Sequence, residues 1–417
     1  MHRRALLTLG TLVAVSACSS GTGGGESDQP DKVEVFSWWD GPGESEGYSA
    51  LIAYFKQQNA NVQFINASVA GGAGTNARAV LASRLDANDP PDSYQIHAGL
   101  ELASDVRAGK VEDLAYLYER NGWLDKFPRA LLDAVTVDGK IYAVPVAIHR
   151  SNLLWYNPAT LRAAGIARPP GTWAEFLADA TTLKAKNLTA LSIGPGWTQK
   201  HLLENVLLGE LGAERYTGLW NGRTTWRSAE VTAAVETFRR VMDVSDLETY
   251  GGDWQSALDK VVAGTAAYTV MGDWADAYFG RAKGLRFTAD YDVVVSPGTA
   301  GVFNFLSDTF TLPKGAPHRA AAESWLTACG SPEGQDAFSV QKRAIAARVD
   351  ADKSKYNDYL TTAMAAWQDP ATVVVGSLTH GVVADTERNS QLDTALAALV
   401  GGGDVAAFVA SVAAMFG

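Results

Sequence analysis

The sequence has few of the residues that build disulfide frameworks and metal centres. Among 417 residues there are two cysteines and six histidines. No CxxC or HExxH pattern and no cluster of Cys and His occurs, so the common sequence signatures of zinc sites are absent and no metal or cofactor is expected. Cys329 lies in a segment that is predicted to be helical, and a buried, unreactive thiol is expected there.

Long apolar runs and an excess of positive charge are also missing. The apolar run at 5–14 has ten residues, whereas a membrane-spanning helix needs about 20. Acidic residues outnumber basic ones by 46 to 35, which gives a formal net charge of −11. This sign argues against nucleic acid as a partner and against broad contact with anionic lipid.

The N-terminus carries the pattern of a secretory signal. Arg3 and Arg4 precede the apolar run, and small residues then lead to Cys18. This order predicts a lipoprotein signal peptide over 1–17, cut before Cys18, which would carry acyl chains. Residues 18–31 are rich in Ser, Gly and acids and are predicted to be a flexible tether. We therefore expect a domain that is lipid-anchored to the outer face of a bacterial cytoplasmic membrane; an ordinary cleaved signal with an accidental cysteine is the alternative.

The rest of the chain alternates between strand and helix patterns. About 385 residues follow the tether, more than one core usually serves, so two domains are expected. β-rich segments at 32–38, 61–69 and 93–97 alternate with helical patterns at 46–58 and 76–87. This order is typical of βαβ units on a parallel sheet, and the predicted fold class is α/β.

Later segments continue this alternation with more helix. Further strands are predicted at 140–146, 151–157, 292–296 and 302–311, and at the end of 259–271. Helical patterns dominate 158–244 and most of the chain after the last strand, with an irregular stretch at 373–385. No internal repeat of 20–50 residues is visible.

Aromatic residues are abundant and several lie beside polar residues in predicted loops. The chain has 12 Trp and 14 Tyr. Those in predicted loops include Trp38, Trp39, Trp197, Trp220 and Trp274. A sugar ring needs this combination, because its C–H face stacks on an aromatic ring while its hydroxyl groups need donors and acceptors. Trp220 is predicted to be structural.

Several segments together resemble the extracellular solute-binding proteins of ABC sugar importers, specifically the glucose/galactose-binding branch of the maltose-binding-like family. They are KVEVFSWW at 32–39, GGAGTNARAVLASRL at 71–85, PPDSYQIHAG at 90–99, YAVPVAIHRSNLLWYNPATL at 142–161, VMGDWADAY at 270–278, SPGTAGVFNFLSDTFTLPKGA at 296–316 and VGSLTHG at 375–381. The resemblance covers nearly all of the chain after the tether.

The resemblance implies a two-lobed periplasmic-binding-protein fold that closes on one sugar by hinge motion. Each lobe would hold a mostly parallel sheet flanked by helices, with three crossovers of the chain between the lobes. The expected N-terminal lobe comprises residues 32–147 and 303–344, and the expected C-terminal lobe comprises 148–302 and 345–417.

Polar and aromatic residues at the ends of predicted strands are the candidate ligand-binding residues, since ligands of open α/β sheets bind beyond the carboxyl ends of strands. Gln95 and His97 share one face of a strand, and the carboxylate of Asp273 beside Trp274 could accept two hydroxyl groups. The predicted set is Trp38, Trp39, Glu44, Gln95, His97, His149, Trp197, Gln199, Asp273, Trp274, Lys342 and His380.

Some of these residues have a simpler interpretation. Either Trp38 or Trp39 could belong to the core, and Glu44 could cap the helix that follows it. Trp197 and Gln199, in the predicted loop 194–200, could serve packing. For His149, Lys342 and His380 the expectation rests on the resemblance, which implies a polar sugar contact or a cleft loop at these positions.

The expected function is binding of a monosaccharide, glucose or galactose, and its delivery to the transmembrane permease subunits of an ABC importer by a monomeric, non-enzymatic protein. An oligosaccharide is the alternative ligand. An anchored glycoside hydrolase with Glu44 and Asp273 as its two carboxylates is a more remote alternative. The two acids would come from opposite lobes, whose separation changes on closure.

Overall fold

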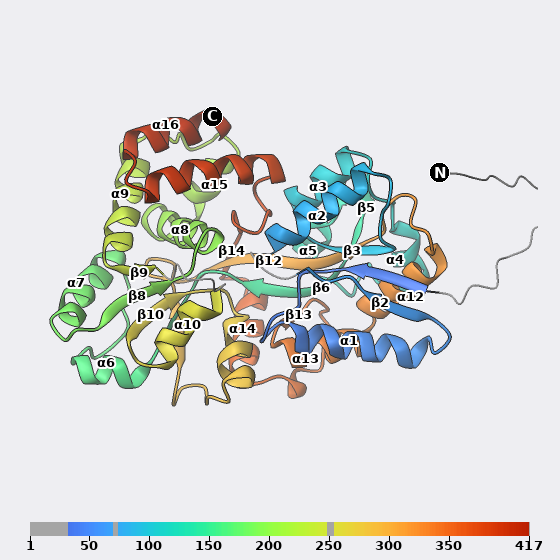
Figure 1. Cartoon of the computed structure of the whole chain (residues 1–417), viewed down its shortest axis with the longest axis horizontal. Coiled ribbons are helices and arrows are strands. Elements are labelled where there is room, and N and C mark those ends of the chain that lie inside the picture. Colours follow the sequence, from blue (N-terminus) through green and yellow to red (C-terminus); the bar gives the residue numbers. More distant parts are fainter. Residues whose placement is uncertain (1–31, 70–73, 248–253, 417) are drawn as a thin grey trace, which may run out of the picture. The chain divides into compact units, whose positions relative to one another are not determined.

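The computed structural model describes residues 32–69, 74–247 and 254–416. Cys18, the predicted signal peptide and the predicted tether up to residue 31 lie outside the described residues, and their assignments stay predictions. The described chain is an α/β structure with one seven-stranded and one five-stranded sheet (Figure 1). The two-lobed α/β fold class predicted from the sequence is confirmed.

The seven-stranded sheet contains the predicted βαβ units. Its order is β13-β6-β12-β3-β1-β2, and β14 pairs with β12. β1 is parallel to β2 and β3, whereas β12 is antiparallel to β3 and β6. Its strands are β1 (Lys32–Phe36), β2 (Gln63–Asn66), β3 (Ser93–His97), β6 (Ala143–Arg150), β12 (Val302–Thr311), β13 (Ile345–Ala346) and β14 (Val373–Gly376).

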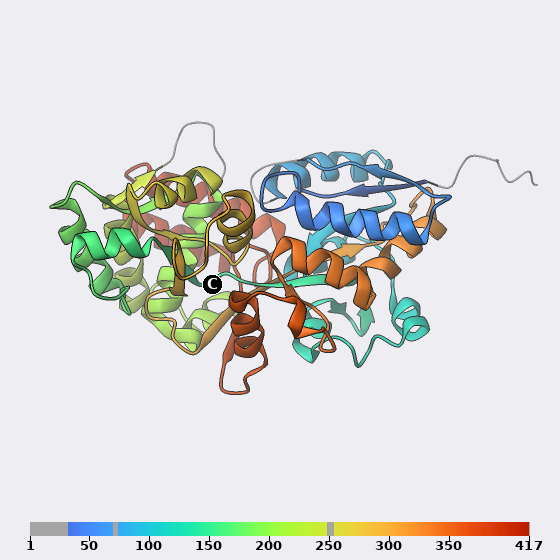
Figure 2. The same ribbon diagram turned by 90° about the horizontal axis from the view of Figure 1, so that it is seen from below.

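Helices cover both faces of this sheet. α1 and α13 pack against each other, α12 and α13 contact β6, and α3 contacts β3, with α2 beside α3 (Figures 1 and 2). These helices are α1 (Ser45–Gln58), α2 (Thr75–Asp86), α3 (Leu100–Arg107), α12 (Arg319–Gly330) and α13 (Pro332–Lys342). Smaller elements at the same end are α4 (Ala115–Asn121), α5 (Arg129–Ala134) and the hairpin of β4 (Thr136–Val137) and β5 (Lys140–Ile141).

The five-stranded sheet has the order β11-β7-β10-β8-β9. Its strands are β7 (Leu153–Tyr156), β8 (Thr189–Ile193), β9 (Ser245–Leu247), β10 (Ala266–Val270) and β11 (Asp292–Val295). β10 is parallel to β8 but antiparallel to β7. Both sheets are therefore mixed, not mostly parallel as expected, because β12 and β7 enter them from the opposite sheet. β12 runs antiparallel to β3 and β6, and β7 runs antiparallel to β10 and β11.

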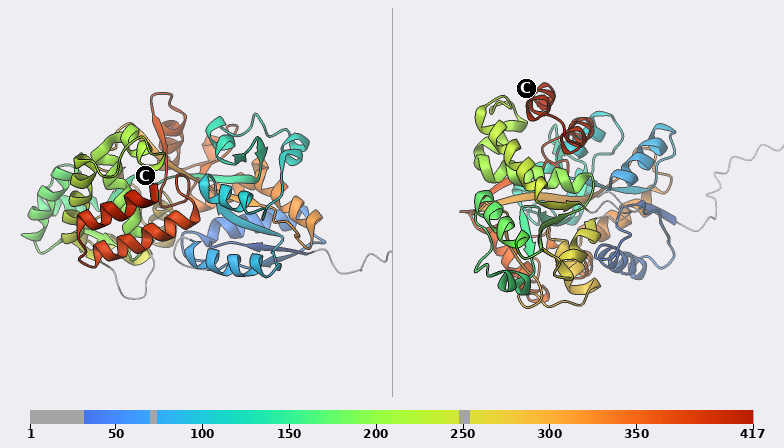
Figure 3. Two further views of the ribbon diagram at one scale, coloured as in Figure 1. Left: turned by 90° about the horizontal axis from the view of Figure 1, so that it is seen from above. Right: turned by 60° about the vertical axis from the view of Figure 1, so that its left-hand side comes forward.

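Helices of the second sheet begin at recognisable caps. Asn157 caps α6 (Pro158–Ala164), which has Pro at its first position, and Thr172 caps α7 (Trp173–Lys184) by accepting a hydrogen bond from Glu175 N. The other helices here are α8 (Trp197–Trp220), α9 (Ala229–Asp243), α10 (Trp254–Val262), α11 (Ala275–Ala277), α15 (Thr386–Val400) and α16 (Val405–Phe416). α14 (Asp358–Gln368) instead contacts β13 of the seven-stranded sheet. α15 packs on α8, and α16 packs on α9 (Figure 3).

Three connections take the chain from one sheet to the other. They lie between β6 and β7, between β11 and β12, and between β14 and α15. The predicted division into lobes at residues 147, 303 and 344 remains a prediction; β13 and β14, which follow residue 344, pair within the seven-stranded sheet. The prediction of an irregular stretch at 373–385 is partly wrong, because the first four residues of this segment form β14.

Several single-residue expectations can be compared with this fold. Cys329 is fully buried in α12, and burial raises the pKa of its thiol, as expected for an unreactive cysteine. Trp220 packs against Trp226 and Phe416, as expected for a structural residue. Among the helices that the structure describes, none combines the length and apolar character needed to cross a bilayer.

Candidate ligand-binding site

One pocket collects most of the predicted binding residues. It has an empty volume of about 340 Å³. Its lining residues come from β3, β6 and β12 of the first sheet, from the starts of α8 and α10, from the end of α13, and from the segments after β1, β10 and β14. They are Trp38, Trp39, Glu44, His97, His149, Trp197, Trp254, Trp274, Leu306, Asp308, Lys342 and His380. All predicted residues are present except Gln95, Gln199 and Asp273.

Indole and imidazole rings form much of the pocket surface. The ring centroids of Trp38 and His97 lie 4.9 Å apart, and those of Trp274 and His380 lie 5.3 Å apart. Trp197 lies 6.3 Å from Trp274 on the same side. Such flat apolar faces beside hydrogen-bonding groups can hold a ring that carries both C–H and hydroxyl groups.

Trp39 lines the pocket but is mainly part of the core. Its ring packs 4.7 Å from Phe338 and 5.9 Å from both Tyr48 and Phe310. Only 2% of its surface is exposed, compared with 6% for Trp38. Of the two neighbouring tryptophans, Trp38 therefore offers its ring to the pocket more directly.

Asp308, on β12, is the central carboxylate of the pocket, and it was not predicted. Its Oδ1 accepts a hydrogen bond of 2.8 Å from Gln95 Nε2. The Nε2 atoms of His149 and His97 lie 3.3 Å and 3.7 Å from its carboxylate oxygens. Burial alone would raise the pKa of Asp308, but the hydrogen bond from His149 and the two imidazole charges outweigh it and lower the pKa. Asp308 is therefore an anion held in place by three side chains.

Asp273 does not reach the pocket and was assigned the wrong position. Its side chain is fully buried, with one oxygen on His149 Nδ1 and the other accepting a hydrogen bond of 3.0 Å from Arg150 N. His149 thus lies between two carboxylates, those of Asp273 and Asp308. Burial would lower its pKa, but the charge and hydrogen bond of Asp273, with the further contribution of Asp308, raise the pKa to about 9. His149 is an imidazolium at neutral pH.

Gln95 supports the pocket from behind. Its amide oxygen accepts hydrogen bonds from Ser37 Oγ at 2.6 Å and from Trp38 N at 3.3 Å, while its nitrogen donates to Asp308. Gln95 therefore fixes Trp38 and Asp308 relative to each other. Gln199 is half-buried in the first turn of α8 and does not line the pocket; the loop predicted at 194–200 is helical from Trp197.

A buried lysine and a half-buried glutamate form a pair of opposite charges on the side of the pocket next to α1 and α13. Lys342 Nζ lies 3.9 Å from Glu44 Oε1 and donates a hydrogen bond of 3.3 Å to the carbonyl oxygen of Gly43. Glu44 precedes α1 but makes no side-chain capping hydrogen bond, so the capping alternative is not supported. A cation and an anion thus both border the pocket.

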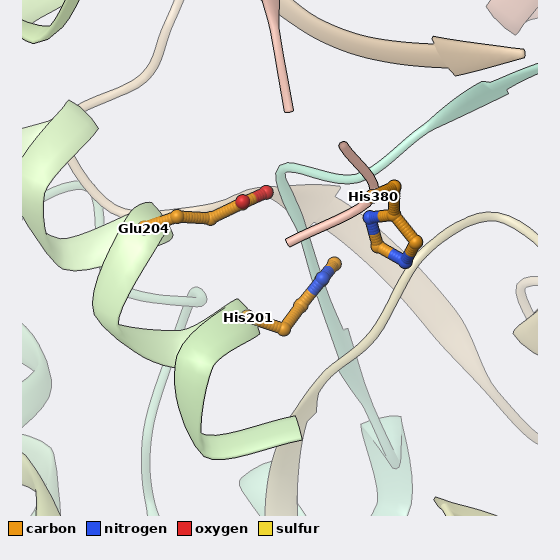
Figure 4. A group of neighbouring side chains, drawn as sticks. All are labelled: His201, Glu204 and His380. Carbon is orange, nitrogen blue, oxygen red and sulfur yellow. The ribbon is translucent and has the colours of Figure 1, made fainter. Parts of the chain in front are cut away.

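A second group of polar residues includes His380 and extends behind it, away from the pocket. His201, Glu204 and His380 each offer a ligand atom within 4.8 Å of the others (Figure 4). Both ring nitrogens of His201 and Nε2 of His380 are buried with no hydrogen-bond partner among the described residues. Burial lowers the pKa of His201 to about 3 and that of His380 well below its usual value, so both rings are neutral. Burial raises the pKa of Glu204, and hydrogen bonds from Thr379, Ser377 and Ser151 oppose this effect.

The residues that sequence analysis missed are those inside regular elements. Asp308 is the one charged residue of β12, and a charged residue within a predicted strand is a signal that could have found it. His201 and Glu204 are one turn apart on a buried stretch of α8, which is a weaker signal. Trp254 begins α10 and is not among the predicted residues.

Comparison with known proteins agrees with this geometry. The chain matches the family described as bacterial extracellular solute-binding protein over residues 41–336. A similar protein is an uncharacterized ABC transporter extracellular-binding protein from Pyrococcus horikoshii, 31% identical over 396 residues that cover 91% of this chain and 89% of that protein. Another is a probable sugar-binding periplasmic protein from Brucella suis, 29% identical over 367 residues that cover 85% and 84% of the two chains.

A solved structure shares the fold. A chitin oligosaccharide binding protein matches with a TM-score of 0.80 at 20% identity, over 92% of this chain and 97% of that chain. The relatives and the family are extracellular or periplasmic, so this protein acts outside the cytoplasm. The chain belongs to the bacterial extracellular solute-binding protein family.

Proposed function

We propose that this protein binds a monosaccharide, glucose or galactose, and delivers it to the permease of an ABC importer. The pocket is the observation that carries this proposal, since it places indole faces beside an aspartate, a lysine and three imidazoles. This composition suits a neutral, polyhydroxylated ring better than a charged or purely apolar solute. The Brucella suis relative, a probable sugar-binding periplasmic protein, supports the ligand class.

The size of the pocket favours one sugar ring over a chain of them. Its empty volume of about 340 Å³ includes space that is open to solvent, so this value is an upper limit on the room for a ligand. Trp38 and Trp274 border it from the segments after β1 and β10, which leaves little length for further rings. An oligosaccharide is the alternative ligand. The shared fold of a chitin oligosaccharide binding protein does not decide between a monosaccharide and an oligosaccharide.

Closure of the two lobes would accompany binding. Trp38, His97 and Asp308 belong to the first sheet and its loops, whereas Trp197 and Trp274 belong to the second. A ligand that touches both sets binds fully only when they approach, so it favours the closed state and shifts the population toward it. The radius of gyration from solution scattering should fall when the correct sugar is added.

The protein would act as a transporter component and not as an enzyme. The hydrolase alternative that the sequence raised uses Glu44 and Asp273 as paired carboxylates beside the substrate. Asp273 is fully buried against His149 and does not line the pocket, which argues against this alternative. Incubation with p-nitrophenyl glycosides should release no nitrophenol, and turnover would contradict the proposal.

The location and assembly proposed from the sequence need their own test. Cys18 would carry the lipid anchor, with residues 18–31 as a tether to the membrane, and the binding domain would work as a monomer. Protein made in a bacterial cell should partition into the detergent phase, and Cys18→Ala should abolish this partition. Wild-type protein that stays wholly in the aqueous phase after processing would contradict the anchor.

A calorimetric screen tests the central proposal. We expect one hexose, glucose or galactose, to bind most tightly among common mono- and disaccharides. Disaccharides should bind more weakly because the pocket lacks room for a second ring. Tighter binding of a di- or trisaccharide would favour the oligosaccharide alternative, and no binding of any sugar would contradict the ligand class.

A further inference from the structure

Glu204 on α8 joins the three connections between the two sheets. Its carboxylate accepts hydrogen bonds from Ser151 Oγ at 3.1 Å, Asn304 Nδ2 at 2.9 Å and Thr379 N at 2.7 Å. Ser151 follows β6, Asn304 begins the long strand β12, and Thr379 follows β14. Ser377 adds a fourth donor, with its Oγ at 3.0 and 3.1 Å from the two oxygens.

The carboxylate of Glu204 has no lone pair left for a metal ion. Its roughly four lone-pair positions face four donors: Ser151 Oγ and Asn304 Nδ2 at Oε1, Thr379 N at Oε2, and the single proton of Ser377 Oγ, which lies within 3.1 Å of both oxygens. Burial raises the pKa of Glu204. However, the Nδ2 of Asn304 faces Oε1 and the backbone N of Thr379 faces Oε2, and both can only donate, so the geometry leaves no acceptor for a proton on these two sides and favours the carboxylate. The hydrogen bonds that connect Glu204 to His380 through Ser377 therefore explain this pair of Figure 4 better than a metal site does.

The hydroxyl group of Ser377 connects Glu204 to His380 by hydrogen bonds. A serine hydroxyl has one proton to donate and two lone pairs. When the proton goes to Glu204, the lone pairs can accept hydrogen bonds from His380 N at 3.3 Å and from His380 Nδ1 at 2.9 Å. Nδ1 must then carry the imidazole proton. In a neutral ring this leaves Nε2 as an acceptor.

The Nε2 atom of His380 is the free end of this chain of hydrogen bonds. It is buried, has no partner among the described residues, and belongs to a ring that lines the pocket. Figure 4 shows the other ring nitrogen of His380 turned toward Glu204 and this one turned away from it. An acceptor at this position requires a donor from the ligand, and a sugar hydroxyl group can supply one.

We propose that Glu204 is a positioning residue, which acts through Ser377 to hold His380 as the Nδ1–H tautomer so that Nε2 accepts a hydrogen bond from a sugar hydroxyl group. This inference rests on the proposed function and deepens it. It assigns one polar contact of the sugar as a hydroxyl donor. A sugar that lacks a hydroxyl group at that position leaves Nε2 without a partner and binds more weakly.

Glu204→Gln is the informative substitution because it keeps the shape and removes the charge. The amide oxygen can still accept from Thr379 N, while its NH₂ group faces Ser377. Ser377 then accepts from the new amide and donates its own proton to His380 Nδ1, which moves the imidazole proton to Nε2. Ser151→Ala is the matched control, since it removes one hydrogen bond to Glu204 and does not touch Ser377 or His380.

The tautomer can be read from the imidazole ¹⁵N chemical shifts of histidine-labelled full-length protein, with His380→Gln used to assign the signals. We expect Nδ1–H for wild type and for Ser151→Ala, and Nε2–H for Glu204→Gln, together with an affinity for the hexose lowered about tenfold or more. Ser377→Ala keeps the other bonds of Glu204 and should also lose the single tautomer, which tests the inference if Glu204→Gln fails to fold.

The outcomes separate this inference from the proposed function. A wild-type signal for Nε2–H, a Glu204→Gln protein with an unchanged tautomer, or a bound metal ion at these histidines would overturn the positioning role. The tautomer switch without binding of any sugar would support the positioning role and overturn the proposed ligand.

Discussion

The two walls of the pocket differ in how far their polar groups are already paired. The first wall is formed by His97, His149 and Asp308 and is supported from behind by Gln95, all on strands of the seven-stranded sheet. The second wall is formed by Trp197, Trp274 and His380, from α8 and the segments after β10 and β14, and His201 of α8 supports it from behind His380. The polar groups of the first wall form one connected network, whereas three imidazole nitrogens of the second have no partner among the described residues.

This difference means that the polar groups of the first wall are preorganised, whereas those of the second wall lack partners until a ligand binds. Asp308 and His149 are oriented before any sugar arrives, because each is fixed by two or more side chains. Unpaired buried polar groups cost free energy. The second wall therefore gains most when hydroxyl groups of a ligand, or water molecules, complete its hydrogen bonds.

Asp308→Asn is expected to have the largest effect on sugar affinity, because it removes the central carboxylate of the first wall. The substitution removes the anion that faces His149 and His97 and leaves their ring nitrogens without a charged acceptor. We expect sugar affinity to fall by about 2–4 kcal/mol. Calorimetry measures this loss, and Glu119→Gln, an acid-to-amide change at an exposed position of α4, is the matched control. An affinity within about 0.5 kcal/mol of wild type would remove Asp308 from the site.

The pH dependence of stability tests the charged state of His149. Its folded pKa of about 9 lies above its ordinary value of 6.5, so its contribution is fully present below pH 6.5 and is lost as the pH rises through 9. The contribution is at most about 3 kcal/mol. The free energy of unfolding should fall over this window in wild type. The fall should be smaller in Asp273→Asn, which removes the main cause of the raised pKa; equal slopes in the two proteins would contradict the assignment.

Trp274→Ala breaks the second wall by removing its main ring face. We expect affinity to fall by about 1–2 kcal/mol, since stacking and apolar contact are lost but the charged network of the first wall remains. Trp274→Phe keeps a flat ring at the same position and should lose less. Titration calorimetry with the hexose distinguishes these cases, and equal losses for the two variants would show that ring stacking is not the interaction involved.

Gln199→Ala should have the smallest effect on sugar affinity. It tests whether the second wall of the pocket extends to this residue. The residue lies in the first turn of α8 beside Trp197 but does not line the pocket. We expect affinity and the free energy of unfolding to change by less than about 0.5 kcal/mol. A loss above 1 kcal/mol in affinity would extend the second wall to this residue.

Asp273 and Asp308 show how much of the candidate site could be predicted from the sequence. Asp273 follows a strand and precedes Trp274, so local pattern favoured it as the acid that contacts a ligand. The structure instead turns its side chain beneath His149. Asp308 lies in the middle of β12 and has no local signal beyond its charge, yet pairing of β12 with β3 and β6 brings it beside His97 and His149. Both positions depend on strand register between distant segments.

The sequence by itself determined the alternation of strands and helices, the helix caps at Asn157 and Thr172, and the clustering of Trp38, His97, Trp274 and His380 at element ends. These features depend on local periodicity and on side chains acting on their own backbone. Only the tertiary structure decided which acid faces the pocket, which histidine is charged, and that Glu204 reaches all three connections between the sheets. These properties depend on burial and on contacts between residues more than 50 positions apart, and a local pattern carries no information about such contacts.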